Sequence, residues 1–567
     1  MRWNLKNTPD IDKVTRLAKE LGIEKSIAAL LVQRNIETFT QAKHFFRPKL
    51  SDLHDPFLMK DMDLAVQRIE KAIEKNENIL VFGDYDVDGT TAVSLVYNYL
   101  FHEYPKVATY IPDRYEEGYG ISYQGIDFAS DNEFTLIIAL DCGIKAIDKV
   151  AYAKERNIDF IICDHHRPGN SLPDAVAVLD PKREDCTYPY DELCGCGIGF
   201  KLIQALAIQR NEPFETLIPY LDLVATAIAA DIVPITGENR ILAHFGLEVI
   251  NTNPRPGIKA LIHQINKETL NITDVVFIIA PRINAAGRMK HGLHAVALLT
   301  EKNFENAQKY ANEIEQYNIN RKDLDKQITL DALEQIKKNK EEDHYSSVVF
   351  DVNWHKGVIG IVASRLIETY YRPTLVFTQS GEYLAASARS VKGFDVYNAL
   401  EACSEYMEQF GGHKYAAGLT LKPENYTRFK SKFEEVVKKT IPEKLLTPEI
   451  TIDAEIYVSN ITPKFYRIIE QFGPFGPQNM KPAFMARGLR DNGYGKKVGA
   501  NEEHLKLNII SGADEKTYNA IGFGLGDKLE LINQGKPFAA VFTIDENHWN
   551  GITTLQLVLK DIKVEEE

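Results

Sequence analysis

Three short apolar runs that each end in acidic or imidazole side chains constrain this chain more than any other feature of its sequence. The runs are ILVF (79–82), LIIAL (136–140) and FIIC (160–163), and they lead into GDYDVDGTT (83–91), Asp141, and the trio Asp164, His165 and His166. Amphipathic helical segments alternate with such runs between residues 79 and 235. Continuous apolar runs joined by helices predict a parallel sheet covered on both faces. We therefore expect an α/β fold whose polar side chains gather at the carboxyl ends of the strands, where such sheets bind ligands.

The side chains at these strand ends are suited to divalent metal ions. In an extended chain, Asp84, Asp86 and Asp88 would emerge on one side. Converging carboxylates repel one another unless a cation compensates them, and mixed Asp and His ligation suits ions such as Mn²⁺. An Asx-rich turn that caps the next helix is the alternative for this segment. A further acid, Asp231, ends the apolar helix LDLVATAIAADIVP, where a turn residue before Pro234 is an equal alternative.

The six cysteines do not add a second metal motif. The one close pair, Cys194 and Cys196 in LCGCGIGF, has no matching second pair, which a structural zinc site would require. The segment GCGIGFK also departs from the spacing of dinucleotide-binding loops, so we expect a tight turn into the helix FKLIQALAI. The N-terminal stretch MRWNLKNTPDIDKVTRL has no apolar region after its basic residue, and no apolar run in the chain is long enough to span a bilayer. Together with the cysteine usage, this predicts a cytoplasmic protein without a membrane partner.

The net charge, taken alone, argues against nucleic acid as a partner. The chain has 66 Lys and Arg against 80 Asp and Glu, a net charge of −14, whereas proteins that coat DNA are normally basic. Carboxylates that bind metal ions add to this count without repelling a phosphate. A nucleic-acid substrate bound in one local site is therefore not excluded.

The length of 567 residues is too great for one hydrophobic core and predicts three or four domains. We expect a helical N-terminal segment (1–75), a parallel-sheet domain (76–240), a helical region with an interdomain linker (241–342), a smaller α/β domain (343–442) and a C-terminal β-barrel (443–567). The polar helical stretch at 300–342 has little apolar surface, so it either bridges two domains or forms a peripheral hairpin. Short runs between Gly- and Asn-containing turns predict the barrel.

The motifs together resemble the DHH phosphoesterase superfamily. GDYDVDGTT, LDCG, CDHH and AADIVP look like its four metal motifs. A second, DHHA1-type domain is suggested by PRINAAGRM (281–289), WHKGVIGIVASRL (354–366), ASARS (386–390) and GGHKYAAG (411–418). FGPFGPQNMKPAF (472–484) and NHWNGITTLQLVLKDI (547–562) look like the oligonucleotide-binding (OB) barrel of the single-strand-specific DNA exonucleases in this superfamily. The resemblance implies a DHH domain and a smaller α/β DHHA1 domain joined by a long helical linker, with a C-terminal OB-like barrel.

This resemblance assigns expected roles to individual residues. It implies two divalent ions, Mn²⁺ or Mg²⁺, bound by Asp84, Asp86, Asp88, Asp141, His165 and Asp231. Whether Asp84 binds metal or supports the other ligands stays open. The implied catalytic residues are Asp141, Asp164, His165 and His166, with Asp164 orienting a histidine and His166 contacting the scissile phosphate. The implied substrate-binding residues, rich in Arg and Gly as phosphate sites are, are Arg282, Asn284, Arg288, His355, Arg389, Gly412 and His413.

The activity implied by the resemblance is two-metal hydrolysis of phosphodiester bonds, by which single-stranded DNA is degraded 5′→3′ to mononucleotides in repair and recombination. The implied partners are single-stranded DNA, a single-strand-binding protein and a RecQ-type helicase, and the expected state is a monomer. Barrel residues Tyr494, Lys496, Lys497 and Trp549 are expected to stack on and track the strand. Relatives that hydrolyse short oligonucleotides, cyclic dinucleotides or pyrophosphate are an alternative, against which the barrel counts. A non-enzymatic DNA scaffold would predict lost metal ligands, and none of the expected ligands is replaced.

Overall fold

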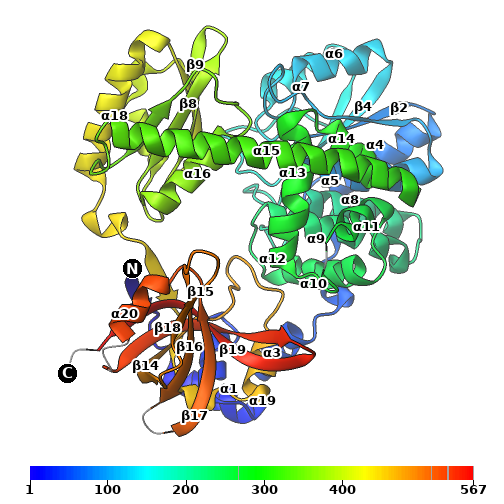
Figure 1. Ribbon diagram of the computed structural model, residues 1–567. Coiled ribbons are helices and arrows are strands. Elements are labelled where there is room, and N and C mark those ends of the chain that lie inside the picture. Colours follow the sequence, from blue (N-terminus) through cyan, green and yellow to red (C-terminus); the bar gives the residue numbers. More distant parts are fainter. Residues whose placement is uncertain (266, 512–513, 533–535, 566–567) are drawn as a thin grey trace.

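The parallel sheet forms where the apolar runs predict it. Figure 1 shows the computed structural model, which describes residues 1–265, 267–511, 514–532 and 536–565. The sheet has the strand order β3-β2-β4-β5-β6 and every neighbouring pair is parallel. Its strands are β2 (Asn78–Gly83), β3 (Val107–Tyr110), β4 (Phe134–Leu140), β5 (Asp159–Cys163) and β6 (Ala177–Leu179). The strands that precede the three polar motifs, β2, β4 and β5, are therefore adjacent, and their carboxyl ends share one edge.

Helices bury both faces of this sheet, as its apolar composition requires. One face packs against α4 (Met62–Glu74), α5 (Val87–Glu103) and α8 (Gly195–Gln209), and the other against α6 (Tyr123–Asp131) and α7 (Ile147–Lys154). Alternate residues of β2 divide between the two cores, with Ile79 and Val81 in one and Leu80 and Phe82 in the other. The sheet is therefore rigid on both sides, which fixes the positions of its strand ends.

Two local expectations are wrong in their details. GDYDVDGTT is not extended, because Asp86 is the N-cap residue of α5 and Asp88 lies in that helix's first turn. The segment GCGIGFK is not a turn before a helix, because α8 already begins at Gly195. In sequence, polar residues and glycines at a helix N-terminus look like a loop. In the first segment the Asp86 side chain accepts a free N–H group of the first turn, and in the second the glycines allow close packing.

The long polar helix bridges the two α/β domains and is not a peripheral hairpin. This helix, α15 (Phe304–Lys338), runs across both domains in Figure 1. Ala307, Ala311 and Ile314 near its start lie in the core of the first domain. Ile328, Ala332 and Ile336 near its end lie in a core of the second domain. The helices α9 (Leu221–Ala230), α10 (Gly237–Thr252) and α13 (Ala280–Met289) pack into the core of the first domain.

The second domain is a smaller mixed sheet with the order β10-β11-β9-β8-β7. Only the β7–β8 pair is parallel. The strands are β7 (Ser347–Phe350), β8 (Thr374–Ser380), β9 (Tyr383–Arg389), β10 (Gln409–His413) and β11 (Ala416–Leu421). Helix α16 (Ile359–Thr369) covers one face and α18 (Tyr426–Thr440) the other. The expected smaller α/β domain is thereby confirmed.

The C-terminal domain is a partly closed barrel, in which β14 pairs with both β18 and β16. Its main strands are β14 (Phe484–Asp491), β16 (His504–Ser511), β17 (Asp514–Gly522), β18 (Phe538–Trp549) and β19 (Ile552–Val564). N-terminal helices share its core, namely α1 (Ile11–Leu21), α2 (Lys25–Val32) and α3 (Phe39–Phe46). The first strand, β1 (Arg2–Leu5), pairs in parallel with β12 (Glu449–Ile452). The two ends of the chain are therefore built into one unit. None of the helices in the described ranges is both long and apolar enough to cross a membrane.

Candidate metal centre

The shared edge of β2, β4 and β5 brings the predicted ligands together. Asp84 follows β2, Asp141 follows β4, and His165 lies two residues after β5. Asp231 reaches the same place from the C-cap position of α9. Adjacent parallel strands place the residues after their carboxyl ends side by side, so residues more than 80 positions apart in sequence meet at one point.

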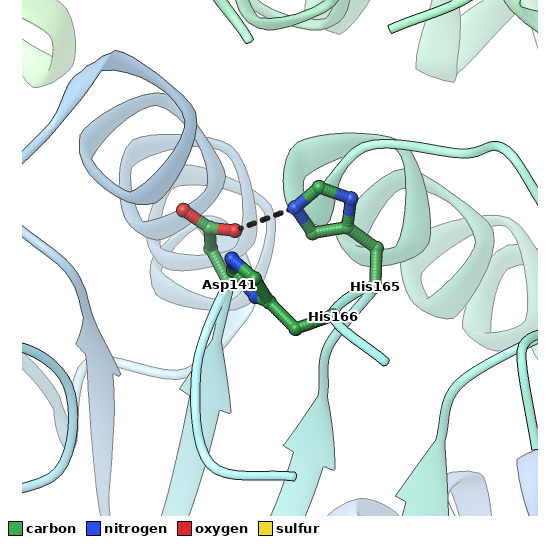
Figure 2. Close-up of side chains that lie close together, drawn as sticks. All are labelled: Asp141, His165 and His166. Carbon is green, nitrogen blue, oxygen red and sulfur yellow. Dashed lines mark ion pairs between the residues drawn. The ribbon is translucent and has the colours of Figure 1, made fainter. Parts of the chain in front are cut away.

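His165 lies at the middle of this cluster. Its Nε2 is 3.2 Å from Asp141 Oδ1, 3.5 Å from Asp231 Oδ2 and 3.8 Å from Asp88 Oδ2. Figure 2 shows the Asp141 carboxylate pointing toward the His165 ring, with His166 beside them. Burial lowers the pKa of His165 to about 3, so its ring is neutral, which is the form that binds a metal ion.

The carboxylates around His165 are buried close together, and their pKa values are raised. Burial, together with the charges of neighbouring carboxylates, raises the pKa of Asp88 to about 6 and that of Asp231 to about 8. The same causes raise the pKa of Asp84 and of Asp141 well above the usual value. Asp84 Oδ2 and Asp141 Oδ1 are buried and accept no hydrogen bond from the described residues. Buried oxygens without donors, beside a neutral imidazole, fit divalent cations that prefer oxygen and nitrogen ligands.

The N-terminus of α8 orients one of these acids. Both carboxylate oxygens of Asp88 accept backbone N–H groups, from Gly195 at 2.6 Å and from Cys196 at 2.7 Å. A Cβ atom on Gly195 would lie 2.5 Å from Asp141 Cβ, so only glycine fits there. The helix therefore fixes Asp88 and stays close to Asp141. The glycines of LCGCGIGF are a visible signal of such close packing, but their partner Asp88 lies more than a hundred residues away in the sequence.

His166 is held by the acid that precedes the two histidines. Its Nδ1 lies 2.7 Å from Asp164 Oδ1, and Asp164 also accepts the N–H groups of Ile144 and His165. Burial by itself raises the pKa of Asp164, but these hydrogen bonds and the charge of His166 lower it overall. Burial lowers the pKa of His166, but Asp164 more than offsets this and raises it above 6.5. The expected orienting role of Asp164 therefore has a matching geometry.

A pocket beside His166 is lined by both α/β domains. It has a volume of about 290 Å³, and its walls include Tyr119, Cys142, His166 and His413. Tyr119 Oη lies 3.2 Å from His166 Nε2, whereas His413 comes from β10 of the second domain. Sequence reasoning included His413 but missed Tyr119, which lies in the motif-free loop EEGYG.

Half-buried arginines from both domains lie near the first motif. Burial, together with the positive charges of Arg114, Arg389 and Arg321, lowers the pKa of Arg288 to about 10. The hydrogen bonds of Arg288 and Arg389 go to neutral groups, Gly357 O at 3.0 Å and Ser387 Oγ at 2.9 Å. Such clustered guanidinium groups favour an anion. Sequence reasoning missed Arg114, whose guanidinium lies 4.6 Å from the centre of the Tyr85 ring.

The remaining predicted substrate-binding residues have different surroundings. His355 Nδ1 accepts the Gly357 N–H at 3.1 Å and so shapes the loop that contacts Arg288. Arg282 makes an ion pair with Glu315 of α15 at 2.6 Å, which directs it toward the linker helix. Asn284 is half-buried on α13 between Arg282 and Arg288. Gly412 has a φ of +141°, and a Cβ there would lie 2.5 Å from Ala416 O.

One further acid at the sheet edge was missed. Asp180 follows β6 directly and is fully buried, and burial raises its pKa to about 7. Its Oδ2 accepts no hydrogen bond from the described residues. Two residues later, Lys182 Nζ donates to His165 O at 2.7 Å. The run AVAVL ends in this acid just as the other three runs end in theirs, so the pattern was visible in the sequence.

Comparisons with known proteins agree with this arrangement. Family models match at residues 78–228 (DHH family, N-terminal domain), 344–439 (DHHA1 domain) and 452–561 (RecJ OB domain). The chain is 37% identical to the single-stranded-DNA-specific exonuclease RecJ of Bacillus subtilis, over 100% of this chain and 71% of that protein. It is 32% identical to the protein of the same name from Escherichia coli, over 89% of this chain and 90% of that one.

A solved structure of a RecJ protein shares the fold of the whole chain. The crystal structure of RecJ in complex with Mn²⁺ from Thermus thermophilus superposes with a TM-score of 0.83 at 25% identity, covering 100% of this chain and 80% of that chain. The DHH, DHHA1 and OB domains occur in the order that the motifs indicate. The chain therefore belongs to the RecJ family.

Proposed function

We propose that this chain is a metal-dependent exonuclease that degrades single-stranded DNA by hydrolysing phosphodiester bonds. The observation that carries the proposal is the cluster in which His165 Nε2 lies within 3.8 Å of three carboxylates. Relatives that align along the chain are named single-stranded-DNA-specific exonucleases. The barrel, which belongs to the RecJ OB family model, favours a polymeric substrate over a dinucleotide.

The proposed ligands of two divalent ions are Asp84, Asp86, Asp88, Asp141, His165 and Asp231. Divalent ions bound at such a site neutralise charge on the phosphate and make a water molecule a stronger nucleophile. The protein itself would hold these ligands in position. Asp88 is fixed by the α8 N–H groups, and His165 is neutral because it is buried.

The remaining side chains are proposed to bind and orient the substrate. Because Asp164 occupies Nδ1 of His166, the Nε2 atom is directed to the side where Tyr119 and the pocket lie. The raised pKa of His166 favours the protonated ring, which suits contact with a phosphate. Arg114, Arg288 and Arg389 would bind phosphate groups on the side of the second domain.

Finer features stay predictions of the family resemblance. These are the 5′→3′ polarity, the mononucleotide product, the role in repair and recombination, and delivery of DNA by a single-strand-binding protein or a RecQ-type helicase. A monomeric state and residence in the cytoplasm stay predictions as well.

The proposal is tested with single strands labelled at either end and incubated with Mn²⁺ or Mg²⁺. We expect the 5′-labelled strand to release a labelled mononucleotide first, and no cleavage in excess EDTA. The Asp141→Ala variant should lose at least about 100-fold in rate, because a metal ligand contributes more than the groups that support it. Asp131→Ala, on the exposed surface of α6, is the matched control. Near-normal activity of Asp141→Ala, or hydrolysis confined to cyclic dinucleotides, would contradict the proposal.

A further inference from the structure

We propose that the C-terminal barrel helps to position the metal ligand Asp231 through one loop, residues 472–479 (FGPFGPQN), which we call the docking loop. The inference rests on the proposed metal centre. It gives the barrel a task beyond holding DNA, because the docking loop lies within the RecJ OB family match yet contacts the DHH side of the molecule.

The docking loop contacts the chain four residues after Asp231. The backbone N–H of Ile235 donates to Pro477 O at 2.9 Å. A Cβ atom on Gly476 would lie 2.5 Å from Ile235 Cγ1, so the loop packs there without space for any side chain. Ile235 is 1% exposed and belongs to the core of the parallel-sheet domain. A shift of the docking loop would therefore move a well-packed residue that is close in sequence to the ligand.

The segment between Asp231 and Ile235 is held in a conformation that needs support at both ends. Ile232 has a φ of +58° and is 65% exposed. Left-handed backbone is costly for a β-branched residue and persists only where the surrounding structure enforces it. On one side Asp231 N–H donates to Ala227 O at 2.9 Å and so belongs to α9. On the other side Pro234 O accepts a hydrogen bond from Asn239 Nδ2 at 3.1 Å, and the next residue, Ile235, packs against the docking loop.

Arg240 of α10 is a second point at which the docking loop is attached. Its Nη1 donates to Phe472 O at 2.7 Å, and its Nη2 donates to Phe45 O at 3.0 Å and Gln471 O at 3.4 Å. The guanidinium carbon lies 3.9 Å from the centre of the Phe45 ring. The side chain is 5% exposed, and burial lowers its pKa to about 10, so it is still charged at neutral pH. A buried cation that satisfies several carbonyl groups is a strong and directional anchor.

The docking loop is also rigid within itself. Asn479 Nδ2 donates to Phe472 O at 2.8 Å and to Pro474 O at 3.0 Å. The backbones of Gly476 and Asn479 exchange two hydrogen bonds, and Asn479 Oδ1 accepts Arg34 Nε at 2.9 Å. A rigid loop attached at Ile235 and at Arg240 transmits the position of the barrel to the segment that begins with Asp231. Gly476 and Arg240 are therefore positioning residues, which touch neither the ligand cluster nor the pocket beside His166.

The test substitutes Gly476 in the full-length chain and measures Mn²⁺ binding by calorimetry, together with kcat and KM on single-stranded DNA. We expect Gly476→Ala to weaken Mn²⁺ binding by about tenfold, as changes behind metal ligands commonly do. We also expect kcat to fall at limiting Mn²⁺ and to recover at excess Mn²⁺, with KM for DNA unchanged. The added methyl group would displace Ile235 and so move Asp231.

Gly526→Ala is the matched control. A Cβ there would lie 2.3 Å from Glu502 O inside the barrel, so it strains the barrel without facing Ile235. We expect Mn²⁺ affinity like that of the unmodified chain. An equal loss of affinity in this control would overturn the inference, because general strain in the barrel would then explain both.

A second pair of variants covers the case in which Gly476→Ala does not fold. Arg240→Met keeps the length and packing of the stem but removes the hydrogen bonds that Arg240 donates to the docking loop, whereas Arg240→Lys keeps the charge. We expect Arg240→Met to weaken Mn²⁺ binding and Arg240→Lys to restore part of it. If Gly476→Ala and Arg240→Met leave Mn²⁺ affinity unchanged and only raise KM for DNA, the inference about the docking loop is refuted while the proposed function still stands. If the unmodified chain binds no Mn²⁺, the proposed function itself fails.

Discussion

Asp88, Asp141 and Asp231 all face His165, yet their surroundings give each a different task. Asp88 accepts two backbone N–H groups from α8, so its position is fixed by the helix. Asp141 has a φ of +59° and an Oδ1 that accepts no hydrogen bond from the described residues, so it is free to bind a cation. Asp231 is the more accessible acid, with a side chain 29% exposed. One residue type thus provides a fixed, a buried and an accessible side chain for the proposed metal site.

The repulsion among these acids predicts a pH-dependent stability of the metal-free protein. Burial, and then the charges of Asp88 and Asp86, raise the pKa of Asp231 from 3.8 to about 8. Between these values the folded chain retains a proton that the unfolded chain has released, so this group makes the fold less stable as the pH rises. In EDTA, we expect Asp231→Asn to melt at a higher temperature than the unmodified chain, by a margin that grows from about pH 5 to about pH 8. Thermal unfolding followed by circular dichroism measures this margin.

Asp131→Asn on the surface of α6 is the control for that series. We expect no margin that grows with pH, since this side chain is exposed and lies away from the cluster. A margin for Asp231→Asn that is largest at low pH would show that repulsion at Asp231 does not limit the stability of the metal-free fold.

At the scale of single elements, α15 combines two apolar ends with a buried polar middle. Asp325 is fully buried and lies 3.2 Å from Arg321 Nη1 on the same helix. It also lies 2.7 Å from Arg365 Nη2 on α16 of the second domain. Arg321 further donates to Asn318 Oδ1 at 3.0 Å. These contacts fasten the linker helix to the second domain, which contributes His413 to the pocket beside His166.

Asp325→Ala should therefore loosen the second domain. Removing the acid leaves two arginines without this partner, and breaking a buried ion pair costs about 3 kcal/mol. We expect a lower denaturant midpoint and a higher KM for single-stranded DNA. Asp331→Ala is the control on the same helix, where an exposed acid accepts a hydrogen bond from Gln327. Equal midpoints for the two variants would contradict the assigned role of Asp325.

At the scale of the whole molecule, the net charge of −14 does not describe the surface that would meet DNA. Five of the acids belong to the proposed metal site, where bound cations would offset their charge. Arg114, Arg288 and Arg389 lie close enough together to lower the pKa of Arg288. Local positive charge can therefore bind phosphate although the chain as a whole is acidic.

This distribution predicts that DNA binding depends strongly on salt. We expect the affinity for a labelled single strand to fall steeply between about 50 mM and about 200 mM salt, because bound counterions are released from each phosphate contact. The measurement is fluorescence anisotropy with Asp141→Ala as the parent, so that the strand is not cut. Adding Arg389→Ala should reduce the slope against the logarithm of salt concentration by about one. Affinity that does not change over this range would show that the local arginines do not bind the strand.

The sequence by itself determined the order of the domains, the parallel sheet and the edge at which its polar residues meet. Apolar runs and helical periodicity are local signals, so β2, β4 and β5 could be predicted from a few residues each. The resemblance of the motifs determined the family in the same way. The conformation of the first motif could not be predicted in this way, because a helix cap and an extended metal-binding loop have the same aspartate-rich composition.

Only the tertiary structure decided how the site is supported. Each supporting contact joins residues far apart in the sequence. Asp88 accepts the N–H groups of Gly195 and Cys196, the Tyr119 hydroxyl contacts His166, and the docking loop packs on Ile235. The same holds for the N-terminal helices, which are amphipathic in sequence but find their apolar partners in the C-terminal barrel. Periodicity shows that a face must be buried, whereas the partner that buries it depends on long-range packing, which no local pattern encodes.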